Sequence, residues 1–244
     1  MAFQQVVPYD LTDVTNVMSL STNFSNNEII FLDSVSNLKT YYAFNQDYKK
    51  ADLVGKIENQ NLRALTSDVE YVIVSHPEFL PAAYQLAEIH QLEDNLNSIV
   101  VTPEQIYNEF SSGKQDVAAI RDFFRMLYKK NNSNFKYALL FGDGSYDNKD
   151  RLSNNTNFIP TYQSVNSLHP TLSYVTDDFY ALLDSDDGDF INDLIDVGIG
   201  RFPVKSISEA IDMVNKVEMY YSSDALGDWR NTVTFVADDG DAKD

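Results

Sequence analysis

From Glu70 onward the sequence alternates short apolar runs with helical patterns, and this alternation limits the possible folds more than any other feature. Three runs typical of buried strands lie at Tyr71–Ser75, Ser98–Val101 and Tyr137–Phe141. Strands covered on both faces have continuous apolar sequences, and strands separated by helices pair in parallel through right-handed crossovers. The sequence therefore predicts an α/β fold with a doubly wound, largely parallel sheet flanked by helices.

The segments between these runs carry helix signals. Residues 81–91 begin with a proline, which is favoured in the first helical turn. Residues 116–130 are also predicted to be helical, because their apolar side chains recur at helical spacing. That apolar stripe comprises Val117, Ile120, Phe123, Phe124, Leu127 and Tyr128.

Two capping boxes mark the starts of further helices. Thr102 is followed three positions later by Gln105, so that each side chain can accept a hydrogen bond from the other residue's backbone N–H. Ser206 and Glu209 repeat this pattern at the start of a helix predicted to reach residue 221. Its inward side chains are predicted to be Ile211, Val214 and Val217.

The chain is predicted to have three parts. Residues 1–50 contain short strand patterns separated by Asn- and Ser-rich turns, and they are interpreted as the β-rich tail of an upstream domain. Residues 51–68 are polar and mixed, which indicates a linker docked on the α/β domain. That domain then spans residues 69–244.

Further strands are predicted in the C-terminal third of the chain. Residues 179–183 and 195–199 are predicted to pair as a hairpin across an acidic loop. Residues 233–237 are predicted to form the last strand, and the sheet is expected to continue past it. Apolar side chains near this strand should therefore be exposed.

The loop inside the predicted hairpin concentrates carboxylates. It holds Asp184, Asp186, Asp187, Asp189, Asp193 and Asp196. Because Ca²⁺ takes about six to eight oxygen ligands, the loop is a candidate calcium site, with Asp143 from a neighbouring strand exit closing the shell. The spacing differs from that of an EF-hand, and a solvated acidic turn is the alternative.

The charge balance limits the possible partners. The chain has 18 Lys and Arg against 37 Asp and Glu, a net charge of −19. A surface this acidic repels phosphate backbones, which excludes nucleic acid as a partner. It suits contact with divalent cations, or it simply keeps the protein in solution. No apolar run is long enough to span a membrane, and the first residues show no signal peptide.

The predicted strand ends offer few catalytic groups. Ligands of a doubly wound sheet bind beyond the carboxyl ends of its strands, which here carry His76, Thr102, Asp143 and residues 238–241. The glycines flanking Asp143 lack the third glycine of a dinucleotide loop, and a magnesium-binding receiver would need acidic residues where Ser75 and His76 stand. The chain has no cysteine and no G-x-S-x-G motif, so His76 is interpreted as structural.

Five segments that contain these elements occur in a characteristic order. They are YVIVSHPEFLPAAYQLAEIH, IVVTPEQIYNEFSSGKQDVAAIRDFFRMLY, YALLFGDGSYD, TDDFYALLD and DVGIGRFPVKSISEAIDMVNKVEMYY. Together they resemble the gingipain family of cysteine peptidases, and within it the sortases of the type IX secretion system. The resemblance covers about residues 55–240 and implies a caspase-like domain of two subdomains, of which residues 69–244 hold the first.

The resemblance also implies an activity. Family members use a cysteine thiolate to attack a peptide carbonyl, with a histidine as acid and base. Both belong to the second subdomain and are expected beyond Asp244, so no residue of this chain is assigned as catalytic and the chain alone is expected to be inactive. The expected whole protein is a cysteine endopeptidase that cleaves C-terminal signals from secreted proteins. The alternative is a non-catalytic, calcium-stabilised adhesion or scaffold protein with a degenerate peptidase fold.

Expectations about ligands, partners and location come from the same resemblance. It suggests calcium where the aspartate of the Gly-Asp turn meets the acidic hairpin. The predicted metal ligands are Asp143, Leu183, Asp184, Asp186, Asp189 and Asp196. The implied partners are protein or peptide substrates and other secretion-system surface proteins. The implied location is extracellular or on the outer face of a Bacteroidetes outer membrane.

Overall fold

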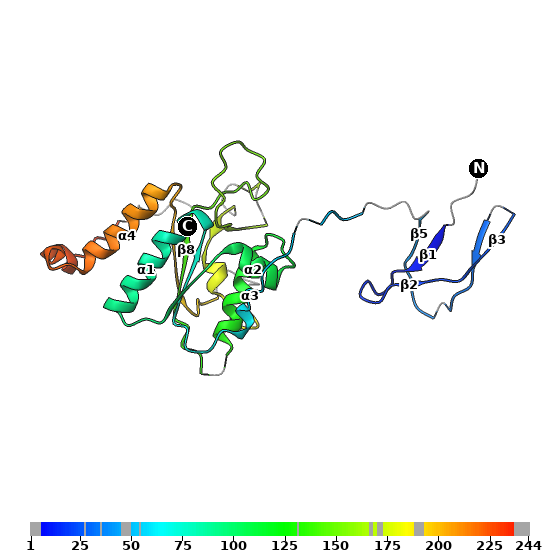
Figure 1. Ribbon diagram of the computed structural model, residues 1–244, viewed down its shortest axis with the longest axis horizontal. Coiled ribbons are helices and arrows are strands. Elements are labelled where there is room, and N and C mark those ends of the chain that lie inside the picture. The colour runs from blue at the N-terminus through cyan, green and yellow to red at the C-terminus, as the bar shows by residue number, and fades with distance from the viewer. Residues whose placement is uncertain are drawn as a thin grey trace, which may run out of the picture. The chain divides into compact units, whose positions relative to one another are not determined.

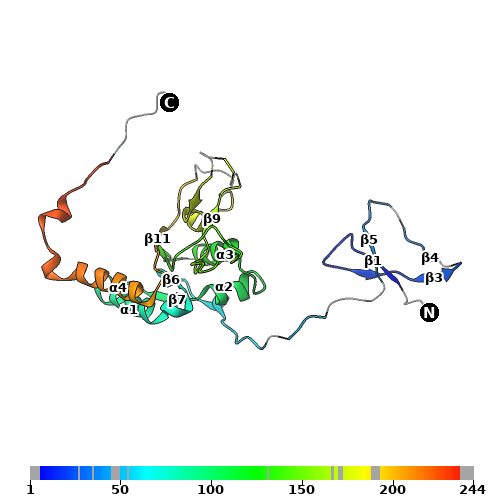
Figure 2. The ribbon, with the colours of Figure 1, turned by 90° about the horizontal axis from the view of Figure 1, so that it is seen from above.

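The computed structural model describes residues 6–26, 28–34, 36–44, 50–53, 55–130, 132–165, 168–169, 173–187 and 193–236. The chain divides into two compact units, Met1–Glu58 and Asn59–Asp244, which are considered separately (Figures 1 and 2). The boundary falls inside the predicted linker. The 3-10 helix η1 (Leu62–Ala64) buries Leu62 in the core of the second unit, so the end of that stretch belongs to the folded domain.

The first unit is β-rich, as the sequence predicted. One antiparallel sheet has the order β2-β1-β5, with β1 (Val7–Asp10) in the middle, β2 (Met18–Ser19) on one side and β5 (Tyr41–Phe44) on the other. A separate antiparallel pair joins β3 (Thr22–Ser25) to β4 (Glu28–Phe31).

The second unit is built on a 4-stranded parallel sheet, which confirms the predicted fold class. Its order is β11-β8-β6-β7, formed by β6 (Tyr71–Ser75), β7 (Ser98–Val101), β8 (Tyr137–Phe141) and β11 (Gly198–Phe202). The two central strands are buried almost throughout, which explains their continuous apolar sequences. Among the described residues β11 pairs only with β8, so its outer edge is unpaired there.

Helices cover both faces of this sheet (Figure 1). On one face α1 (Leu80–Glu93) packs beside α4 (Ile207–Tyr221). On the other face α2 (Pro103–Phe110) packs beside α3 (Val117–Tyr128). Each face has its own apolar core, because successive side chains of the buried strands point in opposite directions.

The two predicted capping boxes differ in the structure. The first is complete, since Gln105 N–H donates to Thr102 Oγ1 at 3.3 Å and Thr102 N–H donates to Gln105 Oε1 at 2.9 Å. In the second, Glu209 N–H donates to Ser206 Oγ at 3.3 Å, but the Glu209 carboxylate accepts from Lys205 N–H at 2.7 Å. The reciprocal bond to Ser206 is therefore replaced by a bond one residue earlier.

The predicted inward face of α4 is partly wrong. Val214 is fully buried and Val217 packs against the core, but Ile211 is 44% exposed. The helix packs through Ala210 and Val214, which are four positions apart on one side. A residue directly after Ala210 is rotated by about 100° and therefore points away.

Two strand predictions in the C-terminal third are wrong. Residues 178–181 form the 3-10 helix η3 (Asp178–Ala181), and β11 pairs in parallel with β8, so there is no hairpin between 179–183 and 195–199. Residues 233–236 are not a strand, because no neighbouring strand in the described part of the chain accepts their backbone hydrogen bonds. Val233, Phe235 and Val236 are exposed, as expected for apolar side chains near that position.

The remaining elements are short. They are β9 (Tyr162–Gln163), β10 (Val175–Thr176), η2 (Pro77–Phe79), η4 (Ser223–Ala225) and η5 (Asp228–Asn231). In the part of the chain that the structure describes, no helix has the length and apolar character needed to cross a membrane.

Candidate functional site

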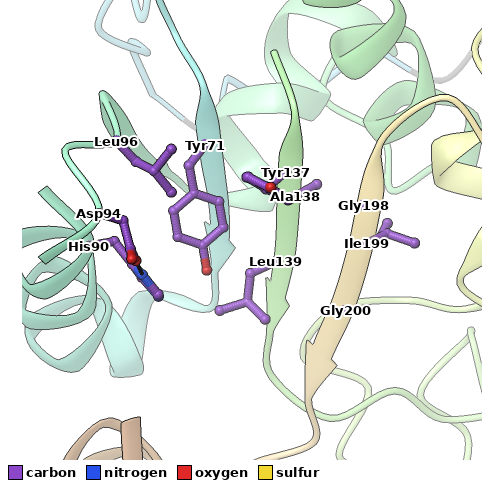
Figure 3. A pocket seen from close by; sticks show the side chains of 10 residues that line it. All are labelled: Tyr71, His90, Asp94, Leu96, Tyr137, Ala138, Leu139, Gly198, Ile199 and Gly200. Carbon is purple, nitrogen blue, oxygen red and sulfur yellow. Dashed lines mark hydrogen bonds and ion pairs between the residues drawn. The ribbon is translucent and has the colours of Figure 1, made fainter. Parts of the chain in front are cut away.

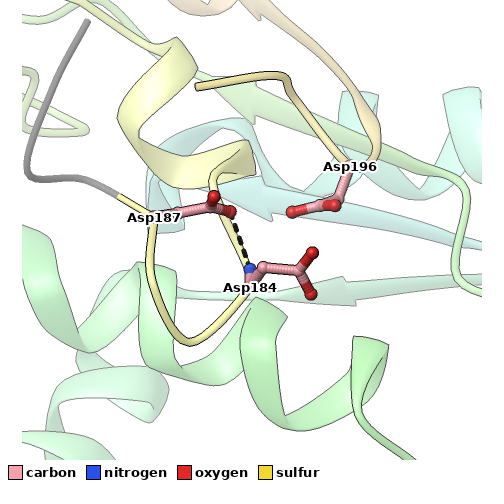
Figure 4. Close-up of side chains that lie close together, drawn as sticks. All are labelled: Asp184, Asp187 and Asp196. Carbon is pink, nitrogen blue, oxygen red and sulfur yellow. Dashed lines mark hydrogen bonds between the residues drawn. The ribbon is translucent and has the colours of Figure 1, made fainter. Parts of the chain in front are cut away.

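Three aspartates converge between η3 and β11 (Figure 4). Asp184, Asp187 and Asp196 each place one carboxylate oxygen within 4.8 Å of the others. Asp184 and Asp187 belong to the turn that follows η3, whereas Asp196 stands shortly before β11. The turn and the start of the strand therefore bring together an acidic cluster from two parts of the predicted loop.

Hydrogen bonds within the loop orient two of these carboxylates. Asp196 accepts from Leu183 N–H at 2.7 Å through one oxygen and from the Tyr128 hydroxyl at 3.1 Å through the other. Asp187 accepts from Asp184 N–H at 2.8 Å. Burial, together with the charges of Asp196 and Asp184, raises the pKa of the Asp187 carboxyl.

Arg121 of α3 binds the backbone of the same loop. Its Nε donates to Leu182 O at 2.6 Å and its Nη2 donates to Asp187 O at 2.9 Å. The guanidinium also lies 4.9 Å from the centre of the Phe179 ring. Burial and the neighbouring charge of Arg125 lower the pKa of Arg121, which nevertheless stays positively charged.

Arg125, one helical turn further along α3, extends this contact. Its Nε donates to Leu183 O and its Nη2 to Asp184 O, both at 3.0 Å. Because residues four positions apart share one face of a helix, the two guanidinium groups donate hydrogen bonds to neighbouring carbonyls of the loop. We call Arg121 and Arg125 the arginine pair.

The cluster fits a hard cation only in part. Calcium–oxygen distances of about 2.3–2.6 Å place two ligands of one ion up to about 5 Å apart, which the three carboxylates satisfy. The loop carbonyls that would complete a typical calcium shell already accept hydrogen bonds from the arginine pair. A cation bound here would therefore rely on carboxylates and water.

The structure brings together only some of the predicted ligands. Asp184 and Asp196 are in the cluster, Leu183 offers a carbonyl that Arg125 binds, and Asp186 is exposed and outside the cluster. The predicted ligand Asp189 lies outside the described residues.

Asp143 is not near the cluster, contrary to prediction. It follows the carboxyl end of β8, whereas Asp196 precedes the amino end of β11, and these strands are parallel. Asp143 N–H donates to Val204 O, eight positions beyond Asp196 along the neighbouring strand. At about 3.3 Å per residue the two aspartates lie at opposite edges of the sheet and cannot share an ion.

Asp143 instead belongs to the carboxyl edge, where the sheet was expected to carry chemistry. Its carboxylate accepts from the Thr156 hydroxyl at 2.5 Å and lies 3.5 Å from Lys205 Nζ. His76 stands at the same edge, at the exit of β6. Its ring contacts Phe79 and Phe158, with centroids 5.5 and 4.5 Å away, and burial lowers the pKa of its imidazole.

Arg201 of β11 connects the loops at this edge through hydrogen bonds. It forms a two-pronged ion pair with Asp177, with nitrogen–oxygen distances of 2.7 and 2.8 Å. Its other hydrogen bonds reach the backbone carbonyls of Gly142, Ile159 and Pro160, at 2.8, 2.8 and 3.2 Å. One side chain therefore holds the turn after β8, the segment before β9 and the start of η3.

The predicted ligand set leaves out Asp187 of the acidic loop, and sequence reasoning also missed three arginines of these sites. Asp187 has the three-residue spacing from Asp184 that closes a turn, which could have included it among the candidate ligands. The arginine pair is marked by its four-residue spacing beside an apolar stripe. Nothing local distinguishes Arg201, because all its partners are distant in sequence.

The parallel sheet with helices on both faces defines an α/β domain. The sequence model of "Peptidase family C25" matches residues 64–244, and the chain belongs to that family. This confirms the resemblance to gingipains found in the sequence. No protein with curated function matches the chain significantly.

Three solved structures are similar to the chain. Dimeric latent PorU from Porphyromonas gingivalis superposes with a TM-score of 0.74 and 30% identity, over 93% of this chain and 23% of that one. The Arg-specific gingipain R (RgpB) gives a TM-score of 0.46 and 16% identity over 64% of this chain and 29% of that one. The complex of the RgpB pro- and mature domains, from Porphyromonas gingivalis, gives a TM-score of 0.45 and 16% identity, over 62% of this chain and 29% of that one. The chain thus spans less than a third of the length of these proteins.

Proposed function

We propose that the chain is the first part of the peptidase domain of a cysteine endopeptidase that acts as a type IX secretion sortase. The observation that carries this proposal is the likeness to PorU, which extends over 93% of the chain at 30% identity. The family match supports the peptidase class. Substrates would be secreted proteins whose C-terminal signals are removed, at the extracellular face of the outer membrane and beside other secretion-system proteins.

In this proposal the chain supplies the scaffold and not the reacting groups. The chain contains no cysteine and therefore no thiolate nucleophile. Its contribution is a rigid carboxyl edge, where Arg201 and Asp177 fix the loops that would face the remainder of the domain. The chain alone should not hydrolyse peptides.

The test compares the 244-residue chain with the longer protein that contains it. Both are incubated with a secreted protein that carries its C-terminal signal, and trimming is followed by intact mass. Trimming by the longer protein that an alkylating agent abolishes, with none by the chain alone, is the expected result. A longer protein that binds surface partners but never trims them would favour the adhesion or scaffold alternative.

We also propose that the acidic cluster binds calcium through its carboxylates. The convergence of Asp184, Asp187 and Asp196 supports this, and their mutual repulsion would be relieved by a cation. Calorimetric titration should show binding that is lost in Asp184→Asn/Asp196→Asn and kept in Asp186→Asn, an exposed residue of the same loop. Equal titration curves for the wild type and the double variant would remove the cluster as the site.

A further inference from the structure

A cavity of about 600 Å³ opens on the face of the parallel sheet that α1 covers (Figure 3). It lies at the amino ends of β6, β8 and β11, and its lining comes from these strands and from the end of α1. The acidic cluster contacts α3, on the opposite face. The volume is within the range of about 300–1,000 Å³ that small-molecule sites occupy.

The cavity exists because β11 presents glycines on this face. Gly198 pairs with Tyr137 and Gly200 pairs with Leu139, so all four positions face α1. A Cβ atom added to Gly200 would meet nothing within 4 Å. Gly200 does not have a positive φ either, so its backbone conformation does not require glycine. The missing side chain leaves a floor of bare backbone on which a flat ring can lie.

Tyr71 supplies a polar group on the wall. The residue is only 8% exposed, and its ring packs edge-on against His90 with centroids 5.1 Å apart. Figure 3 shows its hydroxyl oxygen directed into the space between His90 and Leu139. Among the described residues no side chain or backbone group is hydrogen-bonded to this hydroxyl, and the atom is not itself buried, so it is open to the cavity. A ligand in the cavity can therefore exchange a hydrogen bond with this hydroxyl in place of water.

The second polar element is a pair of side chains at the end of α1. His90 Nδ1 lies 2.7 Å from Asp94 Oδ2, and the Tyr221 hydroxyl donates to the same oxygen at 2.5 Å. The hydrogen bond with His90 and, to a smaller extent, the one from Tyr221 lower the pKa of the Asp94 carboxyl. With Nδ1 engaged by a carboxylate, the Nε2 atom of a neutral His90 is an acceptor. The wall therefore carries acceptors and negative charge.

We propose that this cavity binds a neutral aromatic ring that carries one hydrogen-bond donor, as a phenol does. The ring would lie on the backbone at Gly200, beside the Tyr137 ring that covers Gly198, and against Leu139. Its hydroxyl would reach Tyr71 and His90. The Asp94 carboxylate and the chain's net charge of −19 disfavour a carboxylate-bearing ligand. The inference does not depend on peptidase activity.

The test uses three probes that share one ring. p-Cresol has the ring and the donor, toluene lacks the donor, and p-hydroxybenzoate adds a negative charge. Binding to the 244-residue chain is followed by ¹⁵N-resolved NMR shifts. We expect saturable shifts for p-cresol at residues 71, 90 and 198–200, about fivefold weaker binding of toluene, and none of p-hydroxybenzoate. Equal binding of all three probes would overturn the proposed polar recognition.

Two variants, with a third as control, locate the site. Gly200→Leu should fill the cavity and abolish p-cresol binding, whereas Gly55→Leu, at another glycine with open space around it, should bind as the wild type does. Tyr71→Phe should weaken p-cresol about fivefold without changing toluene. Circular dichroism confirms that each variant is folded.

Other occupants of the cavity give different results. p-Cresol that binds to Phe235→Ser and not to the wild type would mean that the Phe235 ring, exposed in this structure, fills the cavity in solution. The wild-type cavity would then not be open to a phenol, and the proposal would be overturned. Undiminished binding to Gly200→Leu would also overturn it, because the ligand would then sit elsewhere.

Discussion

The side chain of Arg201 shows how one residue can determine the shape of an edge. The side chain is only 12% exposed, and its guanidinium donates hydrogen bonds to the carboxylate of Asp177 and to three backbone carbonyls. A buried charge is tolerated when every donor has a partner, and it becomes costly when one partner is removed. The loops at the carboxyl edge therefore depend on this residue more than on their own sequences.

Replacement of Arg201 should destabilise the protein. Arg201→Met should lower the free energy of unfolding by about 2–4 kcal/mol, because Asp177 and the three carbonyls lose their donor. Chemical denaturation measures the change. The exposed Arg151 gives the matched control, and Arg151→Met should shift stability by no more than about 0.5 kcal/mol. An Arg201 variant as stable as this control would show that the network contributes nothing.

His76 leads to a pH prediction at the same scale. Burial lowers its pKa below the ordinary value of 6.5, while the charges of Glu78 and Glu104 oppose the shift. The unfolded chain therefore binds the proton more readily, and stability should be fully present above about pH 6.5 and decline as the pH falls toward the folded-state pKa. His76→Phe, which keeps a ring between Phe79 and Phe158, should flatten this decline. Unfolding free energies of both proteins between about pH 5 and 8 provide the comparison.

At the scale of elements, α3 stabilises a loop with which it shares no secondary structure. The arginine pair makes four hydrogen bonds to backbone carbonyls of residues 182–187, at 2.6–3.0 Å. In a calcium-binding loop a cation would collect such carbonyls. Here two guanidinium groups do so, which leaves only the carboxylates for any ion.

The arginine pair can be tested separately from the metal. Arg121→Met/Arg125→Met should increase amide hydrogen exchange in residues 182–187 by about tenfold or more, since each charged hydrogen bond contributes about 1.5–3 kcal/mol. Lys129→Met, at the exposed end of the same helix, is the control. Wild-type exchange should remain slow after chelation with EDTA. Rapid exchange in EDTA alone would assign the loop's order to a cation instead.

The sequence predicted elements better than it predicted contacts between them. The strands at 71–75, 98–101 and 137–141 and the helix at 116–130 were recognisable because burial of a strand or of one helical face leaves a periodic pattern. Residues 179–183 were predicted as a strand, but the 3-10 helix η3 occupies residues 178–181 instead. A short apolar run carries no information about whether a partner strand is within reach.

The error over Asp143 has the same origin. Treating 195–199 as half of a hairpin placed Asp196 at the same edge as the exit of β8. Once β11 is parallel to β8, a residue before one strand and a residue after the other lie at opposite edges. The direction of a strand within its sheet depends on the whole chain, so the local sequence could not determine which carboxylates meet.

At the scale of the whole molecule, the second unit contains its own two cores. The earliest residue of these cores is Leu62, so Asn59–Asp244 alone should fold and melt within about 3 °C of the full chain. Calorimetric scans of both proteins test this. A shorter version that begins at Leu65 loses the buried Leu62 and should be less stable by about 2–3 kcal/mol. Failure of Asn59–Asp244 to fold would show that the first unit stabilises the second.

In the described part of the chain the outer edge of β11 has no partner strand, and this affects how the protein behaves at high concentration. A strand with free backbone groups along one side is a template onto which the same strand of another copy can add. The net charge of −19 opposes that approach over a distance that shrinks from about 30 Å at 0.01 M salt to about 3 Å at 1 M. Dilute salt should therefore keep copies of this chain apart, and concentrated salt should allow them to stack edge to edge.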